Sequence, residues 1–465
     1  MTKTADFDLL IVGGGINGAG IARDAAGRGI ATLLVDQGDF GGATSSASTK
    51  LIHGGLRYLE GYHFRLVAES LAEREVMLRL APHLVAPLQF VMPHVPTLRP
   101  AWLIRAGLWL YDRMGGRSSL PRSSGATLRA DGFGAGLKPE FTRGFTYWDT
   151  RVDDARLVIA NLRSAVEHGA TVLPRTRLVS AQREAGIWSA ALASSDGGRR
   201  VTARVLVNAA GPWVGDVIGR TGGRMPAAKV QLVKGSHIVV PRVHEGEHAY
   251  ILQNTDRRIV FVIPYMERWS LIGTTDVAVD NPDGPWAITS AEARYLLDAA
   301  NCYLARPLAE ADIVWSFAGI RPLYDDGKGD PAAITRDYAL VVDEQDGVPG
   351  LAIVGGKLTT YRKLAETVLE RLRPWLATNR GPWTADEALP GGGAPPGDLG
   401  RDFGGGLRQG EVEYFLKHEW ARSADDILWR RTKAGLAMTP AERKSFAAWF
   451  QGIIPGQGKS GGEAG

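Results

Sequence analysis

The fold is decided by residues 7–29, which read F-D-L-L-I-V-G-G-G-I-N-G-A-G-I-A-R-D-A-A-G-R-G. Residues 7–12 are a short apolar run typical of a buried parallel strand, and a glycine-rich turn then leads into a helical stretch. Gly13, Gly15 and Gly18 form the G-x-G-x-x-G pattern. In that pattern the first glycine permits a tight turn, the second lets a pyrophosphate approach the backbone, and the third allows the helix to pack closely on the strand. The stretch predicts a Rossmann-type unit that binds a dinucleotide.

Asp36 is the acidic residue that this pattern requires further along the chain. It ends a second predicted strand, residues 31–35, where its carboxylate would accept a hydrogen bond from an adenosine ribose hydroxyl. The phosphates would rest on the helix N-terminus, because its N–H groups and positive dipole end attract anions. The pattern alone does not separate NAD from FAD.

Two later stretches favour a flavin. Residues 205–211 are an apolar strand that ends in small residues, including Ala210 and Gly211, which suits the approach of a backbone to a cofactor. Residues 351–354 are another apolar strand, followed by Gly355, Gly356 and a helix start. Such a helix N-terminus can face the flavin N1 and C2 carbonyl, where negative charge accumulates on reduction.

The rest of the chain divides by its patterning. Asp153 or Asp154 caps a helix that runs to about His168, and an apolar strand at 171–173 follows, so the cofactor domain resumes after an interruption. Residues 230–240, 259–263 and 269–273 alternate as antiparallel strands do. We predict a cofactor domain from residues 1–75, 150–229 and 345–375, a substrate-binding domain from 76–149 and 230–344, and a C-terminal helical domain at 376–465.

The predicted C-terminal helical domain contains a glycine- and proline-rich linker at 390–406, and two or three amphipathic helices follow the linker. Thr439, Pro440 and Glu442 supply the last helix with its cap, first-turn proline and capping-box acid.

Composition sets further limits. The 465 residues are 45% hydrophobic and 22% charged, with a net charge of +4 and a pI of about 9.1, as expected of a globular protein. Cys302 is the single cysteine, so no intramolecular disulfide can form, and we expect a buried thiol. No segment has the roughly 18 uninterrupted apolar residues of a spanning helix, so any membrane contact is predicted to be peripheral. The charge is diffuse and the histidines are scattered, which predicts neither nucleic-acid binding nor a metal site.

Four motifs resemble the FAD-dependent glycerol-3-phosphate dehydrogenase family. They are residues 12–29, residues 43–60 (A-T-S-S-A-S-T-K-L-I-H-G-G-L-R-Y-L-E), residues 234–242 (K-G-S-H-I-V-V-P-R) and residues 355–365 (G-G-K-L-T-T-Y-R-K-L-A). The resemblance runs from about residue 8 to 389 and returns at 411–434. The family's aerobic bacterial members usually carry a longer C-terminal helical domain. We expect the linker at 390–406 to replace its first helices, which leaves C-terminal packing and homodimer formation open.

The resemblance implies an α/β (α+β) fold with FAD as cofactor. The FAD-binding Rossmann-type domain would be of the glutathione-reductase or amino-acid-oxidase kind, joined to an antiparallel-sheet substrate domain. The implied reaction is the oxidation of sn-glycerol 3-phosphate to dihydroxyacetone phosphate by hydride transfer to the flavin, with electrons passed to a membrane quinone. The implied location is the cytoplasmic face of the bacterial inner membrane, with a soluble fraction as the alternative. The predicted cofactor-binding residues are Gly13, Gly15, Ile16, Asn17, Gly18, Asp36, Thr44, Ser45, Ser46, His53, Gly54, Leu56, Ala210, Gly211, Gly356, Leu358 and Thr359.

The predicted substrate site combines cations with a base. A phosphate carries about 1.5 to 2 negative charges near neutrality, so cationic side chains should converge on it, and arginine binds it in a bidentate manner. The family motifs nominate Arg57, Arg321, Arg336 and Lys357, with Tyr58 adding a hydroxyl. We expect Arg321 and Lys357 to act in catalysis together with His237, which is favoured as the base because histidine titrates near the operating pH. His53 is its rival, but its glycine-rich surroundings suggest that it lies along the flavin.

Residues 98–117 interleave tryptophan, leucine and arginine, a pattern suited to an anionic membrane surface. A core-packed helix with solvated arginines fits it nearly as well. Three other functions stay open: an oxidase that uses oxygen, a flavoprotein related to amino-acid oxidases, and a flavin-bound interaction protein without turnover.

Overall fold

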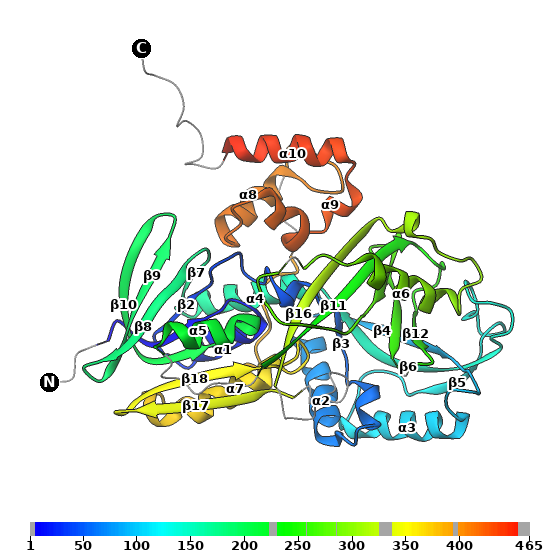
Figure 1. Ribbon diagram of the computed structural model, residues 1–465, viewed down its shortest axis with the longest axis horizontal. Helices are drawn as coiled ribbons and strands as arrows, with labels where there is room; N and C mark the ends of the chain where they lie inside the picture. The colour runs from blue at the N-terminus through cyan, green and yellow to red at the C-terminus, as the bar shows by residue number, and fades with distance from the viewer. Residues whose placement is uncertain are drawn as a thin grey trace, which may run out of the picture.

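The computed structural model describes residues 5–222, 230–256, 258–284, 286–324, 337–393 and 399–453. Two sheets lie next to each other, and the C-terminal helices cover one side of the pair (Figure 1). This arrangement confirms the predicted fold class. The residue limits of the three predicted domains stay a prediction.

The first sheet is the one predicted from the N-terminal stretch. Its main strands, from edge to edge, are β17 (Ala339–Gln345), β18 (Val348–Val354), β10 (Gly197–Asn208), β1 (Phe7–Val12), β2 (Thr32–Val35) and β7 (Thr171–Leu173). The pairs from β18 to β7 are parallel, and β17 adds an antiparallel edge. Because helices or a hairpin cover both faces, the central strands are nearly continuous runs of Leu, Ile and Val.

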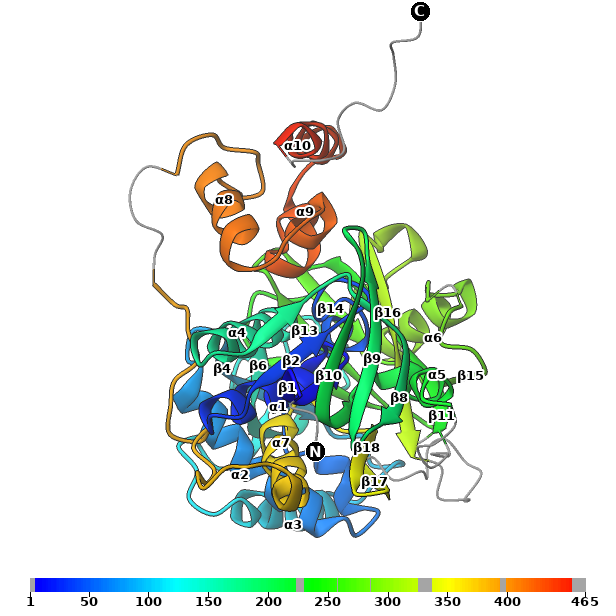
Figure 2. The same cartoon turned by 90° about the vertical axis from the view of Figure 1, so that its left-hand side faces the viewer.

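Three helices cover one face of this sheet: α1 (Ile16–Gly27), α4 (Asp154–Glu167) and α7 (Tyr361–Leu372). Asp153 is the N-cap of α4, since its carboxylate accepts a hydrogen bond of 3.2 Å from the Arg156 N–H. The choice left open between Asp153 and Asp154 therefore falls on Asp153. Strand β9 (Ile187–Ser194) and helix α5 (Val214–Arg220) lie on the other face (Figure 2). The buried Trp188 of β9 and residues of α5 complete a second core there.

The second sheet is mainly antiparallel. Its path is β15 (Val277–Val279), β11 (Val230–Pro241), β14 (Trp269–Gly273), β13 (Ile259–Tyr265), β12 (Ala249–Gln253), β4 (Val85–Pro93), β6 (Arg143–Val152) and β3 (Leu51–Ile52), with β16 (Trp315–Tyr324) beside β11 and β5 (Ser124–Thr127) beside β6. The strands predicted at 230–240, 259–263 and 269–273 are thus confirmed. Helix α6 (Ser290–Asn301) packs on one face, and α2 (Phe64–Leu80) and α3 (Ala101–Met114) pack on the other.

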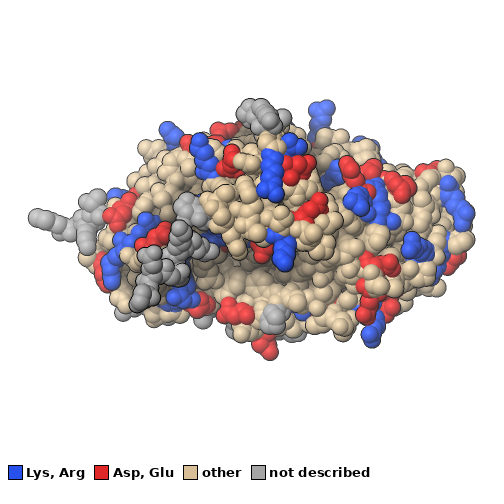
Figure 3. All heavy atoms as spheres, turned by 90° about the horizontal axis from the view of Figure 1, so that it is seen from above, with Lys and Arg blue, Asp and Glu red and all other residues tan. Residues whose placement is uncertain are grey.

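The C-terminal helices form a small core of their own. They are α8 (Gln409–His418), a π-helical turn (Asp426–Arg431), α9 (Ala434–Ala437) and α10 (Pro440–Ile453). The predicted capping box of α10 is confirmed, because the Glu442 N–H donates to Thr439 Oγ1 and the Thr439 N–H donates to Glu442 Oε2. On this side of the molecule, positive and negative side chains are interspersed (Figure 3).

One prediction about the surface is wrong. Cys302 is exposed rather than buried, because it is the C-cap residue where α6 ends at the surface. Among the described residues, no helix has the length and apolar character needed to cross a bilayer.

Candidate active site

The turn between β1 and α1 and the first turn of α1 are packed so tightly that only glycine fits at one position in each. Gly13 has φ +112°, and a Cβ there would lie 2.4 Å from the carbonyl oxygen of Ala209 at the end of β10. A Cβ on Gly18 would lie 1.9 Å from the carbonyl oxygen of Gly13. These are the tight turn and the close helix packing that the glycine pattern requires. Gly15 and Ile16 face the cavity, whereas Gly18 lies behind the turn.

Asp36 fixes the loop that follows β2. Its two carboxylate oxygens accept hydrogen bonds from the backbone N–H groups of Gly14, at 2.6 Å, and Gly38, at 2.7 Å. Burial raises the pKa of this carboxyl. Each carboxylate oxygen has a second lone pair and can accept one more hydrogen bond. That Asp36 accepts a hydrogen bond from a ribose hydroxyl stays a prediction.

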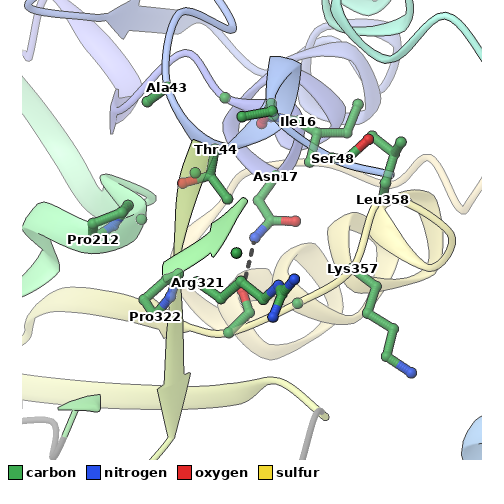
Figure 4. Close-up of a pocket in the computed structure, with 18 of the residues that line it drawn as sticks. Ile16, Asn17, Ala43, Thr44, Ser48, Pro212, Arg321, Pro322, Lys357 and Leu358 are labelled. Carbon is green, nitrogen blue, oxygen red and sulfur yellow. Dashed lines mark hydrogen bonds between the residues drawn. The ribbon is translucent and has the colours of Figure 1, made fainter. Parts of the chain in front are cut away.

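A second glycine loop, after β18, meets the first turn across the sheet. Gly355 and Gly356 both have positive φ, and the Asn17 side-chain amide of α1 donates to the Gly355 carbonyl at 3.1 Å (Figure 4). A Cβ on Gly356 would lie 2.9 Å from the Asn17 amide nitrogen. The two loops predicted to hold the cofactor are therefore tied together by one side chain, although they lie in distant parts of the sequence.

The segment from residue 43 to 56 joins the two sheets. Thr44 Oγ1 donates to the Ile320 carbonyl of β16 at 2.6 Å, and Ser45 Oγ accepts the Ile16 N–H of α1 at 3.0 Å. Thr359, in the second glycine loop, makes long hydrogen bonds through Oγ1 to the backbone N–H and carbonyl of His53. These contacts place the segment along one wall of the cavity.

Two predicted cations are held by neighbours in the same cavity. Arg321, on β16, forms an ion pair with Asp276 and donates to Thr274 Oγ1 at 3.1 Å. Gly235 on β11 leaves room for the guanidinium, because a Cβ there would lie 2.3 Å from Arg321 Nη2. Lys357 Nζ lies 3.7 Å from the centre of the Tyr58 ring, a cation–π contact. Figure 4 shows the Arg321 and Lys357 side chains in the same region of the pocket.

The cavity has a volume of about 1210 Å³, larger than the roughly 300 to 1,000 Å³ of a pocket for one drug-sized ligand. The predicted residues that line it are Gly13, Gly15, Ile16, Asn17, Asp36, Thr44, Ser45, His53, Leu56, Arg57, Tyr58, Ala210, Gly211, His237, Arg321, Gly356, Lys357, Leu358 and Thr359. Gly18, Ser46 and Gly54 lie behind this lining, and Arg336 lies outside the described residues.

Comparison with known proteins decides which cofactor this cavity serves. The sequence profile of the family described as FAD dependent oxidoreductase matches residues 8–362. The chain belongs to that family. FAD is therefore the cofactor of this oxidoreductase.

Individual relatives resemble the oxidoreductase over nearly its whole length. It is 50% identical to the glycerol-3-phosphate dehydrogenase of Pseudomonas aeruginosa, over 97% of this chain and 96% of that protein. It is 46% identical to the D-erythritol 1-phosphate dehydrogenase of Brucella abortus, over 97% of this chain and 99% of that protein. The FAD complex of the glycerol-3-phosphate dehydrogenase from Bacillus halodurans shares the fold, with a TM-score of 0.68, 24% identity and coverage of 97% of this chain and 95% of that chain.

The alignment with the Pseudomonas aeruginosa protein spans 494 positions against the 465 residues of the oxidoreductase. The relative thus has residues without a counterpart here, in line with the expected shortening. That the shortening falls at 390–406 stays a prediction.

The residues of the oxidoreductase fit FAD by shape. The positions of Gly13 and Gly356, where a Cβ would collide with protein atoms, keep the walls of the cavity as bare backbone. Gly15 is the N-cap of α1, so the N-terminus of this helix opens onto the cavity and can hold a pyrophosphate. The second glycine loop leads into α7 on the opposite wall.

His237 of the oxidoreductase lies on β11 and is almost fully buried, with 1% of its surface exposed. Its Nε2 is 3.0 Å from Thr49 Oγ1, and its ring stacks on Phe317 at 4.9 Å between centres. Burial, helped by the charges of Arg321 and Lys50, holds the pKa of His237 well below its usual range. The same surroundings therefore favour the neutral imidazole and disfavour its protonated form, and the role of His237 as the base stays a prediction.

Thr49, Asp276 and Arg430 are among the residues of this cavity that sequence reasoning missed. Thr49 lies inside one of the family motifs, so the motif could have drawn attention to it. Asp276 follows a strand of the second sheet, and only the fold brings it to Arg321. Arg430 belongs to the C-terminal helices, which the sequence separates from the cofactor domain by a linker, yet it lines the cavity.

Proposed function

We propose that this oxidoreductase converts sn-glycerol 3-phosphate to dihydroxyacetone phosphate. The observation that carries the proposal is that three cations from the family motifs, Arg57, Arg321 and Lys357, line the cavity that serves FAD. Several cations suit a phosphate, which carries about 1.5 to 2 negative charges, better than the single charge of an amino-acid carboxylate. The identity of 50% to a glycerol-3-phosphate dehydrogenase over nearly the whole chain supports the same substrate.

Different side chains of the cavity bind the substrate phosphate, remove the hydroxyl proton and hold these groups in position. Bound FAD supplies the acceptor for the hydride that leaves C2 of the substrate. Arg321 and Lys357 hold the phosphate, and this contact fixes the position of C2. Thr49 orients the imidazole of His237 by accepting a hydrogen bond from Nε2–H, and His237 takes the proton of the C2 hydroxyl at Nδ1, which has no hydrogen-bond partner among the described residues. Asp276 keeps the Arg321 guanidinium in place before the phosphate arrives.

A second candidate substrate is D-erythritol 1-phosphate, the substrate given in the name of the Brucella abortus relative. It presents the same phosphate and a longer polyol chain. Both substrates use the same cations, so turnover of each must be compared directly.

The proposed electron acceptor is a membrane quinone, reached from the surface of an anionic bilayer. Helix α3 supports the membrane contact, because Trp102 is 71% and Trp109 is 56% exposed, on the side opposite its buried Ile104, Leu108 and Tyr111. The Arg113 guanidinium lies 4.1 Å from the centre of the Trp109 ring. Exposed tryptophan beside arginine is typical of helices that lie in the membrane interface.

An anaerobic spectrum of the FAD-loaded protein tests the reaction in halves. Addition of glycerol 3-phosphate should bleach the flavin band near 450 nm, roughly where oxidised flavins absorb. A soluble quinone should then restore the band, and oxygen should restore it more slowly. If D-erythritol 1-phosphate bleaches the band and glycerol 3-phosphate does not, the second candidate replaces the first. A faster recovery with oxygen than with quinone would make the protein an oxidase.

A further inference from the structure

The loop from Asp36 to Gly42 lies between the glycine turn that joins β1 to α1, here called the dinucleotide turn, and the C-terminal helices. On its inner side, Asp36 holds the Gly14 N–H, and the Gly41 N–H donates to the Gly14 carbonyl at 3.0 Å. Because this loop follows β2, it lies where a Rossmann-type fold binds the adenosine ribose. Its geometry therefore bears on the affinity for FAD.

On its outer side, the loop is held by a buried ion cluster. Arg431 forms a bidentate ion pair with Asp39: Nη1 donates to Oδ2 at 2.6 Å and Nη2 donates to Oδ1 at 2.8 Å. The Arg431 side chain is fully buried. Arg430 Nε also donates to Asp39 Oδ2, at 2.5 Å. Both arginines come from the π-helical turn of the C-terminal helices. A buried carboxylate that loses such partners is strongly destabilised, so the loop and the turn should stay together.

An apolar contact supports the same docking. Trp420, between α8 and the π-helical turn, meets Phe40 edge to face with 5.3 Å between ring centres. Phe40 is fully buried, and its ring lies against Gly14, where a Cβ would come within 2.4 Å of it. Trp420 thus packs against Phe40, and Phe40 packs against Gly14 of the dinucleotide turn.

Arg430 extends the C-terminal helices into the cavity itself. It lines the cavity together with Gly38 and Asp39. Figures 1 and 2 both show α8 and α9 on the side of the molecule where α4 and β2 lie.

We propose that the C-terminal helices form the outer wall of the site for the adenosine half of FAD and that their docking on Asp39 sets the affinity for the cofactor. Arg431 acts as a positioning residue, because it holds the Asp36 to Gly42 loop without facing the cavity. Arg430 both holds the loop and faces the cofactor. By linkage, bound FAD must stabilise the docked position of these helices in return.

The test measures FAD binding to the full-length apoprotein by flavin fluorescence in the variants R431M and R430M. Freeing the loop lowers the fraction of protein that is competent to bind, so we expect R431M to raise the dissociation constant for FAD about tenfold. R430M should raise it as well. The matched control is R443M, since among the described residues Arg443 donates only to the carbonyls of Gly435 and Met438, both within the C-terminal helices. It should bind FAD as the unmodified protein does.

Folding of each variant is checked by its circular dichroism spectrum. If R431M does not fold, R431K carries the test, because lysine keeps the positive charge but cannot make the bidentate contact with Asp39. Unchanged dissociation constants in the folded variants overturn the proposal. So does hydrogen exchange in α8 and α10 that is equally fast with and without FAD. Neither readout depends on the substrate or on turnover, so failure here leaves the proposed reaction standing.

Discussion

Arg321 is the cation of the cavity with the best-defined surroundings, since Asp276, Thr274 and Gly235 all shape its position. Replacement by alanine removes the bidentate contact proposed for the substrate phosphate. We expect R321A to lower kcat/KM for glycerol 3-phosphate about 100-fold, from the loss of charged hydrogen bonds, while FAD stays bound. Steady-state kinetics and the flavin spectrum measure the two effects. R321K should recover part of the loss, and full catalytic efficiency in R321A would rule out the phosphate role.

His237 and Thr49 form a pair that separates the base from the group that orients it. We expect H237N to lower kcat about 100-fold or more with little change in KM, as loss of a general base does. T49V keeps the shape of the side chain but removes the partner of Nε2, and should have a smaller effect in the same direction. Stopped-flow reduction of the flavin measures both. A wild-type reduction rate in H237N would transfer the role of base to another residue, with His53 as the next candidate.

Among the secondary-structure elements, α3 makes the sharpest prediction, because one face lies in the core and the other exposes Trp102 and Trp109. We expect W102E/W109E to weaken binding to anionic lipid vesicles about tenfold, since it removes aromatic anchors and adds negative charge. Vesicle co-sedimentation measures the effect. The control V314E alters an apolar side chain that is also half exposed but lies next to β16. Equal loss of binding in both variants would contradict a specific role for α3.

Local signals made most elements predictable. The glycine turn after β1, the Asp153 cap of α4 and the capping box of α10 each depend on residues within a few positions of one another. The residues of the cavity could not all be predicted from local signals, because only the fold brings Asp276 to Arg321 and Arg430 to Asp39. Cys302 was misjudged because the average burial of cysteine says nothing about a residue at the surface end of α6.

At the scale of the whole molecule, buried histidines should make stability depend on pH. His244 and His248 stack at 4.3 Å, and burial lowers the pKa of His244 to about 3 and that of His248 to about 4. In the unfolded chain both histidines have pKa values near 6.5, so between about pH 6.5 and pH 4 the unfolded chain binds protons that the folded protein does not bind. Their contribution is complete above pH 6.5 and is lost as the pH falls towards 4 and then 3.

Between pH 7 and 5.5 we expect each of these histidines to lower the free energy of unfolding by about 1 kcal/mol. Urea unfolding at a series of pH values measures the slope. The variant H244F/H248F keeps two stacked rings without the titrating groups and should show a shallower slope over this range. An equal slope in the variant and the unmodified protein would place the acid sensitivity elsewhere.

The interleaving of the first sheet also bears on how the protein is made. A nascent chain carries β1 and the glycine turn out of the ribosome early, but β10 ends at Asn208, β18 ends at Val354, and Arg430 follows still later. Each of them contributes a wall of the same cavity. Tight capture of FAD therefore waits until nearly the whole polypeptide has been synthesised, and a ribosome that stops before the last helices releases a product that holds its cofactor poorly.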